Sequence, residues 1–116
     1  MSGAGSAGAV LVLTEKDSHC ISFYDTASGE RLASVGLPAF PHEFVIDAGR
    51  RYAYAGHYGV RSSGDDGEGG AGVSIIDLLA RQLIGTIDCA PYRRLHGIAL
   101  DGCDRLHVLS EADDVL

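Results

Sequence analysis

Several residue types are rare in this 116-residue sequence, which has no tryptophan, one methionine and three prolines. Long hydrophobic runs are also missing, because the apolar stretch 9–13 is shorter than a membrane span or the core of a secretory signal. The first eight residues carry no cluster of positive charge. We therefore expect no membrane partner, a cytoplasmic location, and a mobile tail over residues 1–8.

Basic residues are few. Nine lysines and arginines stand against sixteen acidic residues, which gives a formal net charge of −7. A protein that binds a nucleic acid backbone needs a clustered basic face, so this balance argues against a nucleic acid partner.

Cysteine is limited to Cys20, Cys89 and Cys103, with no closely spaced pair. An odd number at such distances indicates neither a disulfide framework nor a zinc ribbon. The three side chains are interpreted as small buried hydrophobic groups.

Sixteen glycines and short runs of valine, isoleucine, tyrosine and phenylalanine are what the sequence does contain. This composition is typical of short strands joined by tight turns in one globular domain, here residues 9–116. In the best-covered stretch the strands are expected at 42–47, 51–57, 73–77 and 82–88. The residues expected to supply much of the core between neighbouring sheets are Ile75, Ile84, Ile87, Phe44, Val45, Tyr54, Ile98 and Val108.

An internal repeat organises these strands. The segment from Pro41 to Ala55 matches the segment from Leu95 to Leu109, with His42 and His96 at an offset of 54 residues. A second pair of segments, 21–25 and 73–77, recurs at an offset of 52. Arg51 and Arg105 share a repeat position and are expected to make the same contact.

Four antiparallel strands per repeat of about 40–45 residues are typical of a β-propeller blade. A β-sandwich is the alternative, but a sandwich has no reason to repeat its sequence at a fixed interval. The sequence therefore predicts an all-β fold with about two and a half four-stranded blades of a larger ring. We expect the chain to be a piece of a longer propeller, with the remaining blades as its partners.

Residues 73–87 look like the Val-x-Val-Ile-Asp-Thr-x-Thr-x-x-Val-x-x-x-Ile hairpin of the YVTN-type seven-bladed propellers, and residues 41–54 resemble their Pro-x-x-hydrophobic-Ser-Pro-Asp-Gly segment. Residues 47–49 and 52–59 depart from the family pattern. The resemblance implies a seven-bladed ring and extends to lactonase-like propellers of the 6-phosphogluconolactonase kind.

His42 and His96 open equivalent innermost strands and are expected to share one mouth of a central channel. Paired histidines can bind a ligand or metal, or move a proton. The alternative is that each histidine caps its strand through a hydrogen bond to the backbone. Glu43, His57 and Arg61 complete the candidate ligand-binding residues, with no metal and no cofactor assigned.

The glycine-rich stretch 64–72 contains the letters of a dinucleotide fingerprint, but a strand follows it where a helix is required. Its three carboxylates lack the spacing of a calcium loop. We expect Ser62–Ala71 to be a flexible, solvated insertion, and Arg61, Arg93 and Arg94 around it to be available to an anionic ligand.

Two function classes stay open. The first is a propeller that acts as a binding or scaffold module for a small molecule or a protein. The second, implied by the resemblance, is a lactonase-like hydrolase with its site at the channel mouth. No nucleophile elbow or metalloprotease motif is present to favour the enzyme.

Overall fold

Residues 8–113 and 116 are described by a computed structural model of the chain, and the tail expected at 1–8 lies almost entirely outside them. The described residues form nine β-strands, one 3₁₀ turn (Lys16–Ser18) and no α-helix. None of their helical segments has the length and hydropathy needed to cross a membrane.

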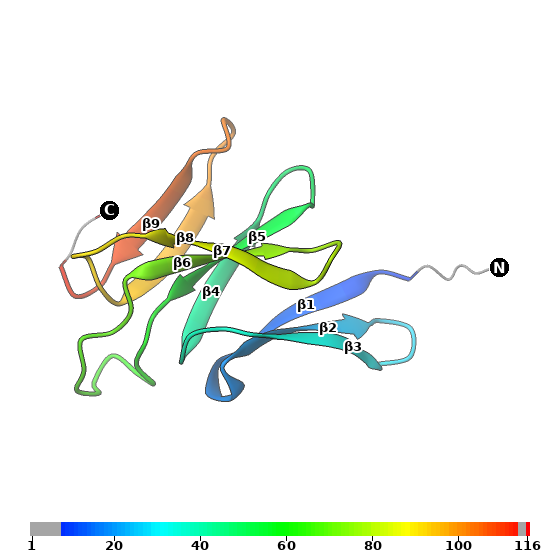
Figure 1. Cartoon of the computed structure of the whole chain (residues 1–116), viewed down its shortest axis with the longest axis horizontal. Coiled ribbons are helices and arrows are strands. Elements are labelled where there is room, and N and C mark those ends of the chain that lie inside the picture. Colours follow the sequence, from blue (N-terminus) through cyan, green and yellow to red (C-terminus); the bar gives the residue numbers. More distant parts are fainter. Residues whose placement is uncertain (1–7, 114–115) are drawn as a thin grey trace.

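The strands form three separate antiparallel sheets, none of them closed, which lie one after another along the molecule (Figure 1). The first sheet contains β1 (Val10–Glu15), β2 (Cys20–Asp25) and β3 (Arg31–Gly36). The central sheet contains β4 (Pro41–Ile46), β5 (Tyr52–His57), β6 (Gly72–Asp77) and β7 (Gln82–Asp88). The last contains β8 (Leu95–Leu100) and β9 (Leu106–Ser110). The predicted strands of the central sheet are confirmed to within one residue at each end, and the architecture fits a partial propeller.

The sequence repeat is also a repeat of hydrogen bonds. The amide of Leu37 donates to the carbonyl of His19 over 2.9 Å, and the amide of Cys89 donates to Ala71 over 2.7 Å. Both partners of the second bond lie 52 positions after those of the first, so the first and central sheets close their outer strands in the same way.

The turn between the first two strands of the repeat differs by one residue between the units. Ile46 pairs with Ala53 across β4 and β5, whereas Leu100 pairs with Leu106 across β8 and β9. The offset is therefore 54 residues for β8 but 53 for β9. An alignment made at a constant offset of 54 misplaces every residue of β9 by one position.

Arg51 and Arg105 do not make the same contact in the described residues, contrary to the prediction, because the last sheet has two strands and no counterpart of Asp77 on β6. The Arg51 guanidinium donates two hydrogen bonds, of 3.2 and 3.1 Å, to Asp77 at the end of β6. The Arg105 guanidinium instead donates to Asp101, in its own turn, over 3.0 Å.

The main core lies between the first sheet and the central sheet. The buried residues that contact one another there are Ile21, Phe23, Val35, Leu37, Ala53, Ala55 and Ile76. Ala53 and Ala55 alternate with Tyr54 along β5, so one face of the central sheet presents small side chains to the large ones of β2 and β3. This fit of large against small allows the two sheets to pack closely.

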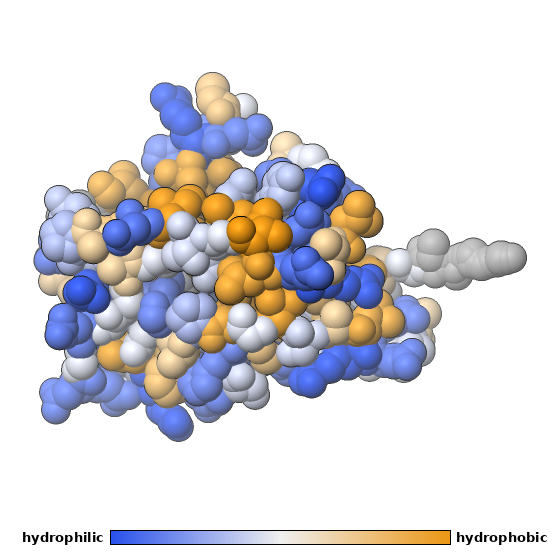
Figure 2. Space-filling view, viewed as in Figure 1, coloured by the Kyte–Doolittle hydropathy of each residue, from blue (hydrophilic) through white to orange (hydrophobic). Residues whose placement is uncertain are grey.

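The predicted core is confirmed in part. Phe44 packs against the main core. Val45, Tyr54 and Ile75 pair across the central sheet on the other face, turned toward β8, and are half-buried, as are Ile98 and Val108. The prediction is wrong for Ile84 and Ile87 on β7, which are 51% and 40% exposed. Figure 2 shows apolar side chains gathered at the centre of the view, where Figure 1 draws β7.

The cysteine prediction holds for one residue in three. Cys20 is buried, Cys89 is half-buried and Cys103 is exposed, and all three are free thiols. Cys103 lies in the turn between β8 and β9, where no second layer covers it.

The glycine-rich insertion has an anchor that the sequence did not reveal. The Arg94 guanidinium donates hydrogen bonds to the carbonyls of Ser63, Asp65 and Gly67 over 3.1, 2.6 and 3.0 Å. Arg94 is thus engaged by the chain itself and is not available to an anionic ligand as the sequence suggested; the flexibility of the segment stays a prediction. As expected, the segment leads into a strand, β6, and not into a helix.

Candidate functional site

His42 and His96 lie side by side at the starts of β4 and β8, two strands that contact each other (Figure 1). Their ring centroids are 4.1 Å apart, with an angle of 38° between the rings. The prediction that the repeat brings these imidazoles together is confirmed. It follows from the geometry of two neighbouring, equivalent strands, each of which carries histidine as its second residue.

Glu43 joins the pair from the position next to His42. Its Oε2 atom lies 3.5 Å from Nδ1 of His42 and 3.5 Å from Nδ1 of His96. Pro41–His42–Glu43 stands where the pairing of β4 with β5 is irregular, between Pro41 and Phe44. That irregularity lets two consecutive side chains turn toward one site instead of alternating across the sheet. We call these three residues the His42–Glu43–His96 cluster.

The strand-cap alternative finds no support in the hydrogen bonds. Within the described residues, Nδ1 of His42 is buried and has no hydrogen-bond partner. Its 3.5 Å approach to Glu43 is an ion-pair distance without hydrogen-bond alignment. A cap would require this group to bond a nearby backbone group.

Tyr58 forms the floor of the site and was not predicted from the sequence. Its ring is 2% exposed and lies 5.3 Å from the His42 ring and 5.2 Å from the His96 ring, centroid to centroid. The Tyr58 hydroxyl donates to the carboxylate of Glu111 at 2.8 and 3.0 Å. The departure from the family pattern at residues 52–59 was the one available signal.

Charged groups surround this floor. The Lys16 ammonium lies 5.0 Å from the centroid of the Tyr58 ring and donates to the carbonyl of Arg61. Glu111 is also paired with Arg94, whose guanidinium nitrogen is 3.6 Å away. Lys16 and Glu111 come from the first and last parts of the chain, so no local motif could have assigned them to the site.

The electrostatics keep His42 uncharged near neutral pH. Burial lowers the pKa of His42 below its ordinary value, and the neighbouring His96 and Lys16 lower it further. Burial, with the nearby Glu111 carboxylate, raises the pKa of Tyr58. A neutral imidazole has a free lone pair on one ring nitrogen and can donate a proton from the other.

His57, a predicted site residue, lies at the end of β5 and serves the loop packing. Its Nε2 atom is 2.9 Å from the carbonyl oxygen of Ala39. A Cβ at Gly70 would lie 2.0 Å from Nδ1 of His57, so the ring rests directly on that glycine. Burial lowers the pKa of His57, and the Ala39 carbonyl opposes this shift.

Arg61 is also outside the cluster. Its guanidinium lies 5.6 Å from the centroid of the Phe40 ring, and its carbonyl oxygen accepts from Lys16. Arg93 contacts Glu68 at 3.4 Å. Of the five predicted residues, the structure therefore brings together His42, Glu43 and His96.

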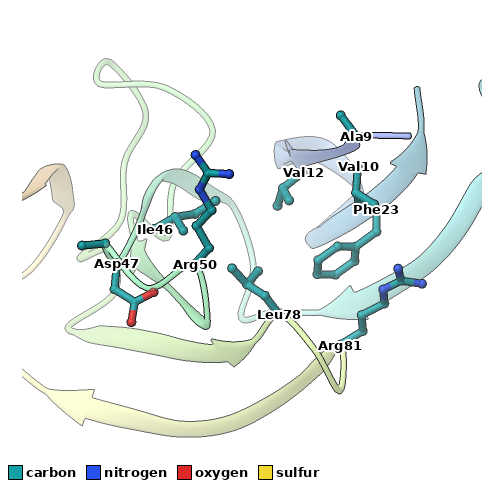
Figure 3. A pocket seen from close by; sticks show the side chains of 10 residues that line it. Ala9, Val10, Val12, Phe23, Ile46, Asp47, Arg50, Leu78 and Arg81 are labelled. Carbon is teal, nitrogen blue, oxygen red and sulfur yellow. The ribbon is translucent and has the colours of Figure 1, made fainter. Parts of the chain in front are cut away.

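A second hollow lies at the opposite end of β4. It is an open groove of about 690 Å³ between the first and central sheets, which we call the turn-end groove. Figure 3 shows Val12 and Phe23 on one side and Ile46 and Leu78 on the other, with Arg50 and Arg81 nearby. Most of the side chains that line the groove are apolar, and its acidic residue, Asp47, already closes the β4–β5 turn.

Comparisons with known proteins bear on the fold. No family model matches the chain, and no curated protein matches it. Among solved structures it is similar to hydrazine synthase of Kuenenia stuttgartiensis, with a TM-score of 0.64 and 14% sequence identity. The match covers 90% of this chain but 30% of that one, so the chain spans less than a third of the neighbour's length. At this identity the likeness shows a shared arrangement of strands and nothing about activity.

Proposed function

We propose that this chain is part of a β-propeller of the YVTN type and acts as a binding module for a small ligand at the His42–Glu43–His96 cluster. The observation that carries the proposal is the meeting of His42 and His96, which come from equivalent positions of successive repeat units. In a propeller these positions open the innermost strands, and the ligand would enter at one end of the channel that they line.

The chemistry of the cluster favours a ligand rich in hydroxyl groups. The Glu43 carboxylate accepts hydrogen bonds, and an imidazole can donate from one ring nitrogen and accept at the other. The buried Tyr58 ring packs beneath both imidazoles and holds them in place, so the polar atoms of the cluster face the ligand. The side chains of Glu43 and His96 are 43% and 39% exposed, so a ligand can reach both.

A lactonase-like hydrolase is the second candidate. It is favoured by the same constellation, because a neutral imidazole next to a carboxylate is suited to remove a proton from water that attacks a lactone carbonyl. The binding module and the hydrolase therefore share one site and differ in whether a bound lactone is opened. A protein partner and the cytoplasmic location predicted from the sequence are further parts of the proposal that the cluster does not address.

The test uses the full chain after dialysis against EDTA, with glucono-lactone and the corresponding open acid as probes. Two-dimensional NMR spectra should show shifts centred on the cluster, and His42→Ala should abolish them while the melting temperature stays nearly unchanged. Arg50→Ala, in the turn-end groove, is the matched control and should keep the shifts. Shifts confined to the groove, or none with either probe, would contradict the proposal; ring opening faster than in buffer would select the hydrolase.

A further inference from the structure

The donor set of the cluster is that of a transition-metal site. Two imidazole nitrogens and one carboxylate oxygen converge, and all three ligand atoms lie within 4.8 Å of one another. Nitrogen from histidine suits zinc and its neighbours in the periodic table, whereas calcium and magnesium require mostly oxygen. The chemistry therefore points to a divalent ion of the zinc class.

The spacing agrees with coordination to one ion. Donors bound to zinc at 2.0–2.2 Å with tetrahedral angles lie roughly 3.3–3.5 Å apart. Oε2 of Glu43 is 3.5 Å from Nδ1 of each histidine. One oxygen placed at the same distance from two nitrogens is thus already near the geometry that an ion would impose.

A second observation comes from the unused hydrogen-bonding capacity. Nδ1 of His42 is buried and without a hydrogen-bond partner, which costs free energy unless something else satisfies its lone pair. An ion held by Glu43 and His96 would do so. Lys16, over the Tyr58 ring, is the positive charge that opposes a cation there, and its hydrogen bond to the Arg61 carbonyl draws it toward the insertion loop.

We propose that His42, Glu43 and His96 bind one zinc-class divalent ion, with a water molecule or the ligand itself in the remaining coordination position. Two histidines and one glutamate with an open position are a ligand set found in catalytic zinc sites, where the ion polarises a carbonyl or activates water. The inference deepens the proposed function, because it rests on the same cluster as the ligand-binding site.

The test titrates Co²⁺ into the EDTA-treated full chain and follows its visible absorption, with Zn²⁺ as competitor. We expect one Co²⁺ per chain and no thiolate charge-transfer band, since the ligands contain no sulfur. Glu43→Gln and His96→Ala should each weaken binding by at least about tenfold, because loss of a direct ligand costs no less than loss of a supporting residue. His107→Ala and Cys103→Ser, whose side chains lie outside the cluster, should bind as the wild type does.

Circular dichroism of each variant shows whether it folds. If His96→Ala does not fold, the near-isosteric Glu43→Gln still decides the test. No Co²⁺ binding, or binding that both cluster variants retain, would overturn the metal site. Loss of binding in Cys103→Ser would do the same by assigning the ion to a thiol. If Co²⁺ does not bind but the EDTA-treated chain still binds the lactone, the metal inference falls and the proposed function stands. If Co²⁺ binds but neither the EDTA-treated nor the Zn²⁺-loaded chain binds the lactone, the small-ligand role falls and the metal site stands.

Discussion

The two ends of the central sheet both carry charged side chains, but the fold uses them differently. At the turn end, Asp77 accepts hydrogen bonds from the Arg51 guanidinium and from the amides of Leu79 and Ala80. At the other end, His42 has a buried nitrogen without a partner, and Glu43 approaches two imidazoles at 3.5 Å. Polar groups that the fold has saturated hold the turn, whereas unsaturated ones are free to bind something else.

The same contrast separates the residues that the sequence singled out. Arg93 and Arg94 were expected to be available to an anion, yet both contact the chain's own carboxylates or carbonyls. Arg51, for which a structural contact was expected, makes one with Asp77. Of the histidines that the sequence singled out for ligand binding, His42 and His96 are the ones that lie together in the described residues. A substitution at each end of the sheet can show whether this division between structural and binding groups is correct.

The largest expected effect is that of Tyr58→Ala, because Tyr58 is the buried support beneath the exposed cluster. Removing a large side chain that is 2% exposed should lower the free energy of unfolding by about 3–5 kcal/mol, as for other large-to-small core substitutions. Urea denaturation followed by fluorescence measures it. Tyr58→Phe, which keeps the ring and loses the hydrogen bonds to Glu111, should cost about 1 kcal/mol. Equal losses in the two variants would mean that the hydroxyl, and not the packed ring, supports the site.

An intermediate effect is expected at the turn end when the pH falls. The hydrogen bonds from Arg51, followed by that from the Ala80 amide, hold the pKa of Asp77 below its ordinary value of 3.8. The unfolded chain then binds a proton at a pH where the native Asp77 does not, so the stabilisation is complete above about pH 5 and declines as the pH falls through 4 and below.

The measurement is the urea midpoint as a function of pH from neutrality downward. Asp77→Asn should lower the midpoint near neutral pH and flatten its decline in acid. Arg51→Gln should flatten it similarly, since Arg51 is the main cause of the lowered pKa. An unchanged acid slope in both variants would show that Arg51 and Asp77 are not coupled in the folded protein.

The strands and the histidine pair were predictable because both follow from the repeat. Once His42 and His96 occupy equivalent positions on neighbouring strands, sequence offset alone places them together. The choice of core face was not predictable, because the strands of the central sheet are apolar on both sides and only the packing of β2 and β3 shows which side is covered. The contact between Tyr58 and Glu111, 53 residues apart, and the anchoring role of Arg94 depend on how the loops fold back.

The smallest effect on stability is expected at Glu43, and it is the sharpest test of the comparison. Glu43 is 43% exposed, and its Oε2 atom makes ion-pair contacts with His42 and His96 but no hydrogen bond to the described backbone. Glu43→Gln preserves the shape of the side chain, so the free energy of unfolding should change by no more than about 0.5 kcal/mol in the absence of metal. With Zn²⁺ present, the wild type should gain stability in proportion to the logarithm of metal concentration, and the variant should gain much less. Thermal denaturation with EDTA measures the stability of each protein without metal, and thermal denaturation with added Zn²⁺ measures the stability gained from the ion. A large loss of stability in EDTA would place Glu43 with Asp77 among the structural groups, because a carboxylate that the fold needs cannot be removed without cost even when no ligand is bound.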